Sequence, residues 1–212
     1  IRFMTSHPKD LSDELIEVMK HSKKICRHLH LPLQSGSTKI LTAMNRRYTK
    51  EQYLELAEKI RKEIPDIVLR TTLITGFPGE TEEDHEELKE FVDEMEFDRL
   101  GVFTYSPEED TKAASLDNQV DEEVKLCRKD EIMELQQEIS MDKSERLVGK
   151  EFEVIIEGKA SDEDVYVGRS YMDAPSVDGY VFINSEEELM SGDFAKVRIV
   201  KAMEYDLIGE LI

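Results

Sequence analysis

Two glycines follow a run of apolar and β-branched residues near the middle of the chain. The segment 71–81 reads TTLITGFPGET, and Thr81 with Asp84 can form the capping box of a following helix. Gly76 and Gly79 would let the backbone approach a ligand closely at the carboxyl end of a buried strand. Parallel α/β folds bind ligands at that edge. A turn that needs glycine for geometry alone is the competing interpretation, because G-x-x-G is a weak motif in isolation.

A second polar turn lies earlier, in the sequence PLQSGS. Gln34 and Ser35 follow a strand pattern and precede a helix, so we predict that they face the same edge as the glycine turn. Ser37 is interpreted as the helix N-cap. Arg46 and Arg47 come after that helix, and either guanidinium could bind a ligand carboxylate in a bidentate manner. The alternative is a solvated helix end, where cations interact favourably with the helix dipole.

Cysteine and histidine offer little further chemistry. Cys26 and Cys127 are far apart and form neither a disulfide framework nor a zinc motif, which is typical of a reducing cytoplasm. Cys26, His28 and His30 alternate along one strand, where a third ligand lies too far away, so we predict no metal site. Cys127 is interpreted as an inert, partly buried thiol. His85 lies in an acidic helix and is expected to be solvated.

The elements that would position these residues alternate between strand and helix. Apolar residues at alternate positions indicate strands, and apolar residues at helical spacing indicate helices. The strand–helix–strand–helix–strand order favours parallel strands joined by helical crossovers, hence an α/β fold. The expected strands cover residues 28–33, 67–75 and 99–105, and the expected helices cover 53–64, 80–96 and about 120–147.

The pattern changes near Gly149. Short strand patterns then begin near residues 151, 164, 179, 194 and 207, with turn residues between them. This spacing is typical of a small β-barrel, so we predict five antiparallel strands. We place the boundary between residues 146 and 147, which gives one domain over 1–146 and a second over 147–212.

The chain is strongly acidic. Its 212 residues include 28 Lys+Arg and 48 Asp+Glu, a net charge of −20. From Gly149 onward there are 15 acidic and 6 basic residues, a net charge of −9. This charge disfavours nucleic acid and favours a basic protein as the partner. The sequence shows neither an apolar run that would span a membrane nor a signal peptide, so we expect a cytoplasmic protein without membrane contact. The helix 80–96 holds ten acidic residues and one lysine, and is expected to present a solvated outer face.

Four motifs together resemble the radical S-adenosylmethionine methylthiotransferases: PLQSGS, MNRRYT, LRTTLITGFPGET and FDRLGVFTYSPEEDTKAA. The C-terminal strands resemble the TRAM domain of that family. The resemblance implies the second half of a radical SAM (β/α) partial barrel, followed by a small OB-like antiparallel five-stranded β-barrel. It also implies radical C–H activation, followed by sulfur insertion and methylation.

Different parts of the chain resemble different branches of the family. YSPEEDTKAA, RSYMDAPSVDGYVFI and EYDLIGEL resemble the branch that methylthiolates an aspartate of small-subunit ribosomal protein twelve. HLHLPLQSGS and RRYTKEQYLELAEKIRKEIP resemble the branch that modifies tRNA adenosine. We favour the first branch, because the acidic barrel suits a basic ribosomal protein better than tRNA.

The resemblance implies roles for particular residues. Gln34 and Arg46 match positions that hold the ribose and the amino-acid end of S-adenosylmethionine, and the stretch from Ile74 to Gly76, with its turn to Glu80, matches a motif beside the adenine. The full set expected to bind the cofactor is Gln34, Ser35, Arg46, Ile74, Gly76, Glu80, Phe103 and Tyr105, with Ser106 beside the last two.

Asp173 and Asp178 precede a glycine in a connection between barrel strands. They are expected either to dock a basic substrate or to serve the turn alone, because Asp and Gly suit turns.

The chain departs from the family in its cysteines. The family holds a 4Fe–4S cluster by three cysteines spaced C-x3-C-x2-C, and Cys26 with Cys127 cannot do so. Because the chain also starts at Ile1, we expect the C-terminal part of a longer enzyme, with no catalytic residue of its own and no activity alone. The expected partner is a basic ribosomal protein, and the chain is expected to be a monomer. An acidic, non-catalytic module that docks basic proteins is the alternative from another class.

Overall fold

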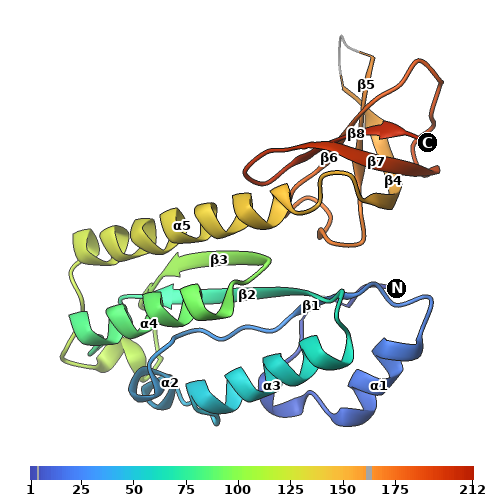
Figure 1. Cartoon of the computed structure of the whole chain (residues 1–212). Coiled ribbons are helices and arrows are strands. Elements are labelled where there is room, and N and C mark those ends of the chain that lie inside the picture. Colours follow the sequence, from blue (N-terminus) through green and yellow to red (C-terminus); the bar gives the residue numbers. More distant parts are fainter. Residues whose placement is uncertain (4, 161–163) are drawn as a thin grey trace. The chain divides into compact units, whose positions relative to one another are not determined.

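The computed structural model of the chain describes residues 1–3, 5–160 and 164–212 (Figure 1). The chain divides into two compact units, Ile1–Gln136 and Gln137–Ile212. The division falls inside the long helix α5 (Glu122–Glu145).

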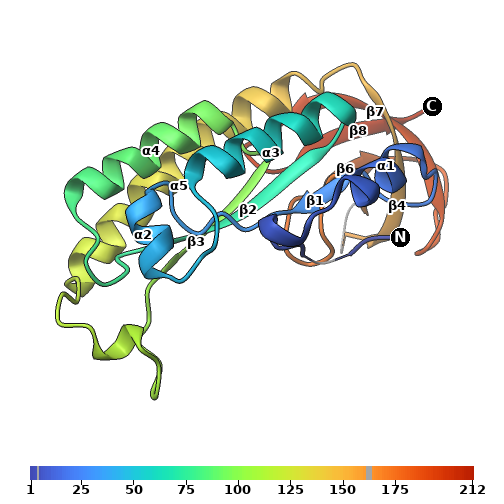
Figure 2. The ribbon, with the colours of Figure 1, turned by 90° about the horizontal axis from the view of Figure 1, so that it is seen from below.

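The first unit contains a three-stranded parallel sheet in the order β1–β2–β3. Figure 2 shows α3, α4 and α5 on one side of this sheet. The strands are β1 (His28–His30), β2 (Val68–Thr75) and β3 (Arg99–Thr104). The helices are η1 (Pro8–Asp10), α1 (Asp13–His21), α2 (Thr38–Ala43), α3 (Lys50–Glu63), α4 (Glu82–Met95), η2 (Ala113–Ser115) and the first part of α5. The predicted alternation of parallel strands and helices is confirmed.

The central strand β2 has two different faces. Leu69, Thr71, Leu73 and Thr75 are at most 1% exposed, whereas the residues between them are half-buried. Side chains alternate across a strand, so every second residue of β2 belongs to one face. One face of β2 therefore packs into the core, and the residues on the other face are available to line a binding site.

Helix α4 begins as predicted but is more buried than predicted. Thr81 caps it, with the reciprocal capping box to Asp84. The expected solvation of His85 is wrong, because its side chain is fully buried and its Nε2 lies 3.1 Å from Glu131 of α5. Asp84 is also buried, and it accepts a hydrogen bond of 2.7 Å from Ser37. Helix α5 covers a face of α4. From the acidic composition of α4, this face was expected to be in contact with solvent.

The second unit contains a closed barrel in the order β4–β5–β6–β8–β7. Four neighbouring pairs are antiparallel, and β6 with β8 is parallel. A closed barrel with an odd number of strands cannot alternate direction throughout, so one parallel pair is unavoidable. The predicted five-stranded barrel is confirmed with that addition. Its strands are β4 (Glu151–Lys159), β5 (Val165–Arg169), β6 (Val181–Asn184), β7 (Phe194–Ala202) and β8 (Leu207–Leu211).

Inward-facing apolar side chains fill the barrel. They include Val154, Ile156, Val181, Ile183, Val197 and Ile199, each at most 1% exposed. Across the described part of the chain, no helix is both long and apolar enough to cross a membrane.

Candidate functional site

The first unit contains a cavity of about 810 Å³ at the carboxyl ends of β2 and β3. This volume is within the usual range for sites that bind small molecules and cofactors. The cavity is lined by Ala43, Met44, Asn45, Arg46, Thr72, Ile74, Phe77, Phe103, Thr104, Tyr105, Ser106, Lys112 and Ala113.

The charge of the cavity wall is opposite to that of the chain. Arg46 and Lys112 line it, and none of its described lining residues carries a carboxylate, although the whole chain has a net charge of −20. Neither cation forms an ion pair with a residue in the described part of the chain. The cavity therefore suits a ligand with an anionic group.

Half of the predicted cofactor residues meet in this cavity. Arg46, Ile74, Phe103 and Tyr105 all line it, whereas Arg47 does not. Arg46 is half-buried, and its backbone N–H donates to the carbonyl of Leu41 at 2.8 Å, which holds the end of α2 in place. Phe103 is 62% exposed, so its apolar side chain is accessible to a ligand in the cavity.

Tyr105 forms the wall with Phe77. Their rings lie 5.3 Å apart in an edge-to-face arrangement. The Tyr105 hydroxyl is buried, yet it has no hydrogen-bond partner among the described residues. Buried hydroxyls normally have a partner, so this group is available to a ligand.

Gln34 lies beside the cavity wall in a strained conformation. Its φ of 79° is in the left-handed region, and its backbone bonds to Thr72 and Ile74 of β2 at 2.9 Å each. The side-chain Oε1 is buried without a hydrogen-bond partner in the described chain. Strained backbone and unpaired polar atoms both concentrate at functional sites.

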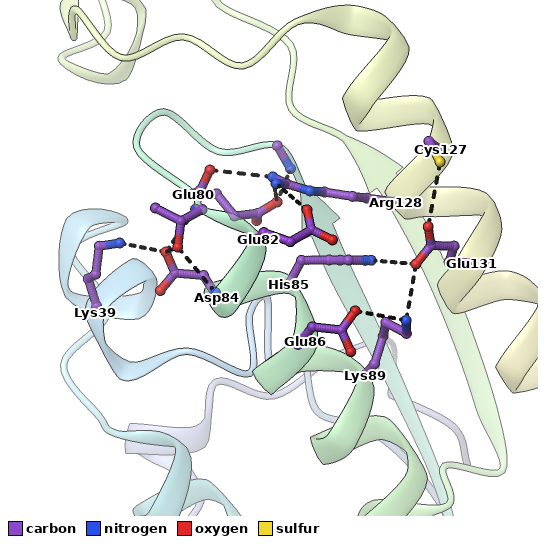
Figure 3. Close-up of polar contacts among 12 residues, drawn as sticks. Lys39, Glu80, Glu82, Asp84, His85, Glu86, Lys89, Cys127, Arg128 and Glu131 are labelled. Carbon is purple, nitrogen blue, oxygen red and sulfur yellow. Dashed lines mark hydrogen bonds and ion pairs between the residues drawn. The ribbon is translucent and has the colours of Figure 1, made fainter.

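Three of the residues predicted to bind the cofactor instead stabilise the two turns. Ser35 is buried, and its Oγ accepts a hydrogen bond from the N–H of Ser37 at 3.2 Å. Gly76 has a φ of 72°, which favours glycine. The carboxylate of Glu80 accepts from the Gly76 N–H at 2.8 Å and from Arg128 at 2.9 Å (Figure 3). None of the three lines the cavity.

Several lining residues escaped the sequence reasoning. Thr72 precedes the glycine turn on the same strand face as Ile74, so the alternation of β2 could have identified it. Asn45 has a φ of 58° after α2, a conformation that asparagine tolerates better than most residues. Lys112 lies in an irregular loop after β3, where periodicity gives no signal.

Both predicted docking aspartates form hydrogen bonds within their own loop. Asp173 is 2% exposed, and its carboxylate lies 3.4 Å from the hydroxyl of Ser170. Asp178 is half-buried and accepts from the N–H of Ala174 at 2.9 Å. Both contacts are the local turn chemistry that Asp commonly provides.

The described residues do not form a metal centre. No group of three or more His, Cys, Asp or Glu among them could hold a metal ion. The interpretation of Cys127 as partly buried is wrong: its thiol is exposed on α5 and lies 3.5 Å from Glu131.

Two family models match parts of the chain. The radical SAM superfamily model matches residues 1–92, and the TRAM domain model matches residues 148–212. One solved structure, coproporphyrinogen III oxidase (HemN) from Escherichia coli, a radical SAM enzyme, has a TM-score of 0.54 at 20% identity and covers 64% of this chain and 31% of that chain. At this identity the likeness shows the fold alone.

Curated relatives are much closer in sequence. The "Ribosomal protein uS12 methylthiotransferase RimO" of Lachnoclostridium phytofermentans is 54% identical over 209 residues, which cover 99% of this chain and 48% of the relative. The protein of that name from Pelotomaculum thermopropionicum is 51% identical over 213 residues, covering 100% and 48%. The chain thus spans about half the length of the curated relatives it matches. It belongs to the RimO-type radical SAM methylthiotransferases and corresponds to their C-terminal part.

Proposed function

We propose that this chain holds S-adenosylmethionine and docks the substrate in an enzyme that methylthiolates an aspartate of ribosomal protein uS12. The observation that carries the proposal is the cavity at the ends of β2 and β3, which has two cations, no described carboxylate in its wall and an unpaired buried hydroxyl. The name of the curated relatives gives the reaction and the substrate.

The residues present fit the cofactor. The guanidinium of Arg46 would bind its carboxylate, the ring of Phe103 would cover its adenine, and the Tyr105 hydroxyl would complete a hydrogen bond that the chain leaves open. Gln34 would offer its unpaired Oε1 to a hydroxyl of the ribose. When bound, the cofactor supplies the radical chemistry and the methyl group.

An iron–sulfur cluster does not fit this chain. Its two cysteines, Cys26 and Cys127, are fewer than the three thiolates that the resemblance requires. The cluster ligands therefore belong to another part of the enzyme, and we expect the 212-residue chain to be inactive alone. The proposed roles of this chain are to hold the cofactor and to exclude water from its adenosine end.

The barrel carries the proposed docking surface. Its net charge of −9 from residue 149 onward matches a basic ribosomal protein and opposes tRNA. We place this domain at residues 147–212 and the cofactor-binding domain at 1–146, in a monomeric cytoplasmic protein. A purely non-catalytic acidic module would not need the cationic cavity of the first unit.

Binding measurements with the 212-residue chain test the choice of substrate. Fluorescence anisotropy would compare labelled uS12 with labelled tRNA at about 0.05 M and about 0.2 M salt. We expect binding to uS12 that weakens with salt, and weaker binding to tRNA at both concentrations. Glu186, Glu187 and Glu188 are exposed, so changing all three to Gln makes the barrel less acidic and should weaken binding to uS12. Tighter binding to tRNA at the higher salt concentration would overturn the choice of substrate.

A further inference from the structure

Two buried cations of α5 contact the two ends of the Gly76–Glu80 turn. Lys125 and Arg128 are three positions apart on one helix, so their side chains share a face. They are 5% and 6% exposed, whereas their neighbours Leu126 and Cys127 are exposed. Neither cation lines the cavity. Lys125 and Arg128 are also not among the residues proposed to contact the cofactor.

Lys125 contacts the start of the turn and the end of β3. Its aliphatic stem occupies the space beside Gly76, so a Cβ at that glycine would overlap with it. Its ammonium donates to the carbonyl of Tyr105 at 3.0 Å and lies 5.5 Å from the centre of that ring. Its own carbonyl accepts from the hydroxyl of Thr75 at 3.1 Å. One lysine therefore joins the carboxyl ends of β2 and β3.

Arg128 contacts the end of the turn (Figure 3). Its Nη1 donates to the Glu80 carboxylate at 2.9 Å, and the same Oε1 accepts the N–H of Gly76 at 2.8 Å. Its Nη2 donates to Glu82 at 3.1 Å. The side chains of Arg128 and Glu80 are 8% and 1% exposed. This ion pair closes the turn on itself.

Burying a cation beside a turn costs desolvation free energy. Apolar contacts of similar volume often stabilise a fold at least as well as a buried ion pair. Hydrogen bonds from charged donors, in return, are directional and fix the positions of their acceptors. Here the acceptors are Glu80 and the Tyr105 carbonyl, and Phe77 and Tyr105 form the adjacent cavity wall.

We propose that Lys125 and Arg128 are positioning residues, which hold the Phe77–Tyr105 wall in the geometry that S-adenosylmethionine requires. The inference rests on the proposed function, because it assumes that the cofactor occupies the cavity. It predicts that the two cations act on cofactor affinity without touching the cofactor. A merely structural role would change stability and leave the affinity of the folded protein unaltered.

Calorimetry with S-adenosylmethionine separates the two roles. Lys125→Met keeps the stem beside Gly76 and removes the charge, and Arg128→Gln breaks the ion pair with Glu80. Lys129→Gln is the matched control, because Lys129 is on the same helix and has no hydrogen bond or ion pair with a described residue. Circular dichroism at the measuring temperature would establish that each variant is folded.

We expect each of the two test variants to bind S-adenosylmethionine about tenfold more weakly, and the control to bind like the unchanged chain. If folded Lys125→Met and Arg128→Gln bind within about twofold of the unchanged chain, the inference is overturned while the proposed function stands. If Arg128→Gln does not fold, Lys125→Met decides alone. If the unchanged chain does not bind at all, the proposed function fails, and the inference fails with it.

Discussion

Arg128 donates a hydrogen bond of 2.9 Å to the carboxylate of Glu80, which lies 48 positions earlier in the chain. The contact joins α5 to the glycine turn that follows β2, inside the first unit. Because the same carboxylate holds the Gly76 N–H, the turn beside the cavity depends on a helix from a distant part of the sequence.

Arg128→Gln should make stability depend on pH. Burial raises the pKa of Glu80, and the Gly76 N–H and the Arg128 guanidinium oppose that rise. Without Arg128 the pKa of Glu80 rises further. A carboxyl whose folded pKa is raised favours the fold below its unfolded pKa and loses that contribution as the pH rises through the folded pKa.

Urea unfolding of Arg128→Gln would therefore show a larger loss in the free energy of unfolding at about pH 8 than at about pH 5. At the higher pH we expect a loss of about 3–5 kcal/mol, the usual result of breaking one side of a buried ion pair. Lys129→Gln should show neither effect. A loss that is equal at both pH values would contradict the assigned role of Glu80.

Asp84→Asn should destabilise the first unit at neutral pH. Burial alone would raise the pKa of Asp84, but hydrogen bonds from Lys39, the Thr81 backbone and Ser37 lower it to about 2. A lowered pKa gives stability that is present above the unfolded pKa and lost as the pH falls through the folded pKa.

The expected loss for Asp84→Asn is about 2 kcal/mol at pH 7, and it should shrink as the pH falls below about 4. Urea unfolding measures both quantities. Asp93→Asn is the control, since Asp93 is exposed on the same helix. A difference between Asp84→Asn and the unchanged chain that persists undiminished at about pH 3 would show that the charge of Asp84 is not responsible.

Gly76→Ala should cost more stability than Gly79→Ala. Both glycines have positive φ, 72° and 84°, so alanine is strained at either by about 1–2 kcal/mol. Only at Gly76 would the new Cβ overlap with the stem of Lys125, whereas nothing lies near it at Gly79. Thermal unfolding should rank the two variants in this order. Equal losses would mean that Lys125 does not pack against Gly76.

Gly179→Ala should destabilise the barrel. A Cβ at Gly179 would overlap with the backbone carbonyl of Tyr205, which cannot move as a side chain can. We expect a loss of about 1–3 kcal/mol, the usual cost of overpacking. Gly158→Ala, where a Cβ meets open space, is the control and should change stability little. The barrel's unfolding transition, followed by circular dichroism, would reveal the difference, and similar transitions for both variants would contradict the packing described.

The elements of the fold were predictable because local signals agree with the tertiary structure. The β-branched run before Gly76 forms β2, and the Thr81 capping box opens α4. Contacts between distant segments left no such signal. His85 lies among acidic residues, so nothing local shows that α5 buries it.

The site was predictable in part. The resemblance to the family implied that Phe103 and Tyr105 bind the cofactor, and both line the cavity. The choice between Arg46 and Arg47 depends on how the chain leaves α2, which spacing alone does not show. Glu80 was expected beside the cofactor, but its partner Arg128 carries no motif that would have placed it at the turn.

Titration calorimetry with two neighbouring arginine variants tests whether the cavity at the ends of β2 and β3 binds S-adenosylmethionine through Arg46. Arg46 lines the cavity, and Arg47 is exposed and does not. The proposed role of Arg46 predicts that the unchanged chain and Arg47→Gln bind with similar affinity, and that Arg46→Gln binds at least about tenfold more weakly. Equal binding by Arg46→Gln and Arg47→Gln, or no binding by the unchanged chain, would contradict it.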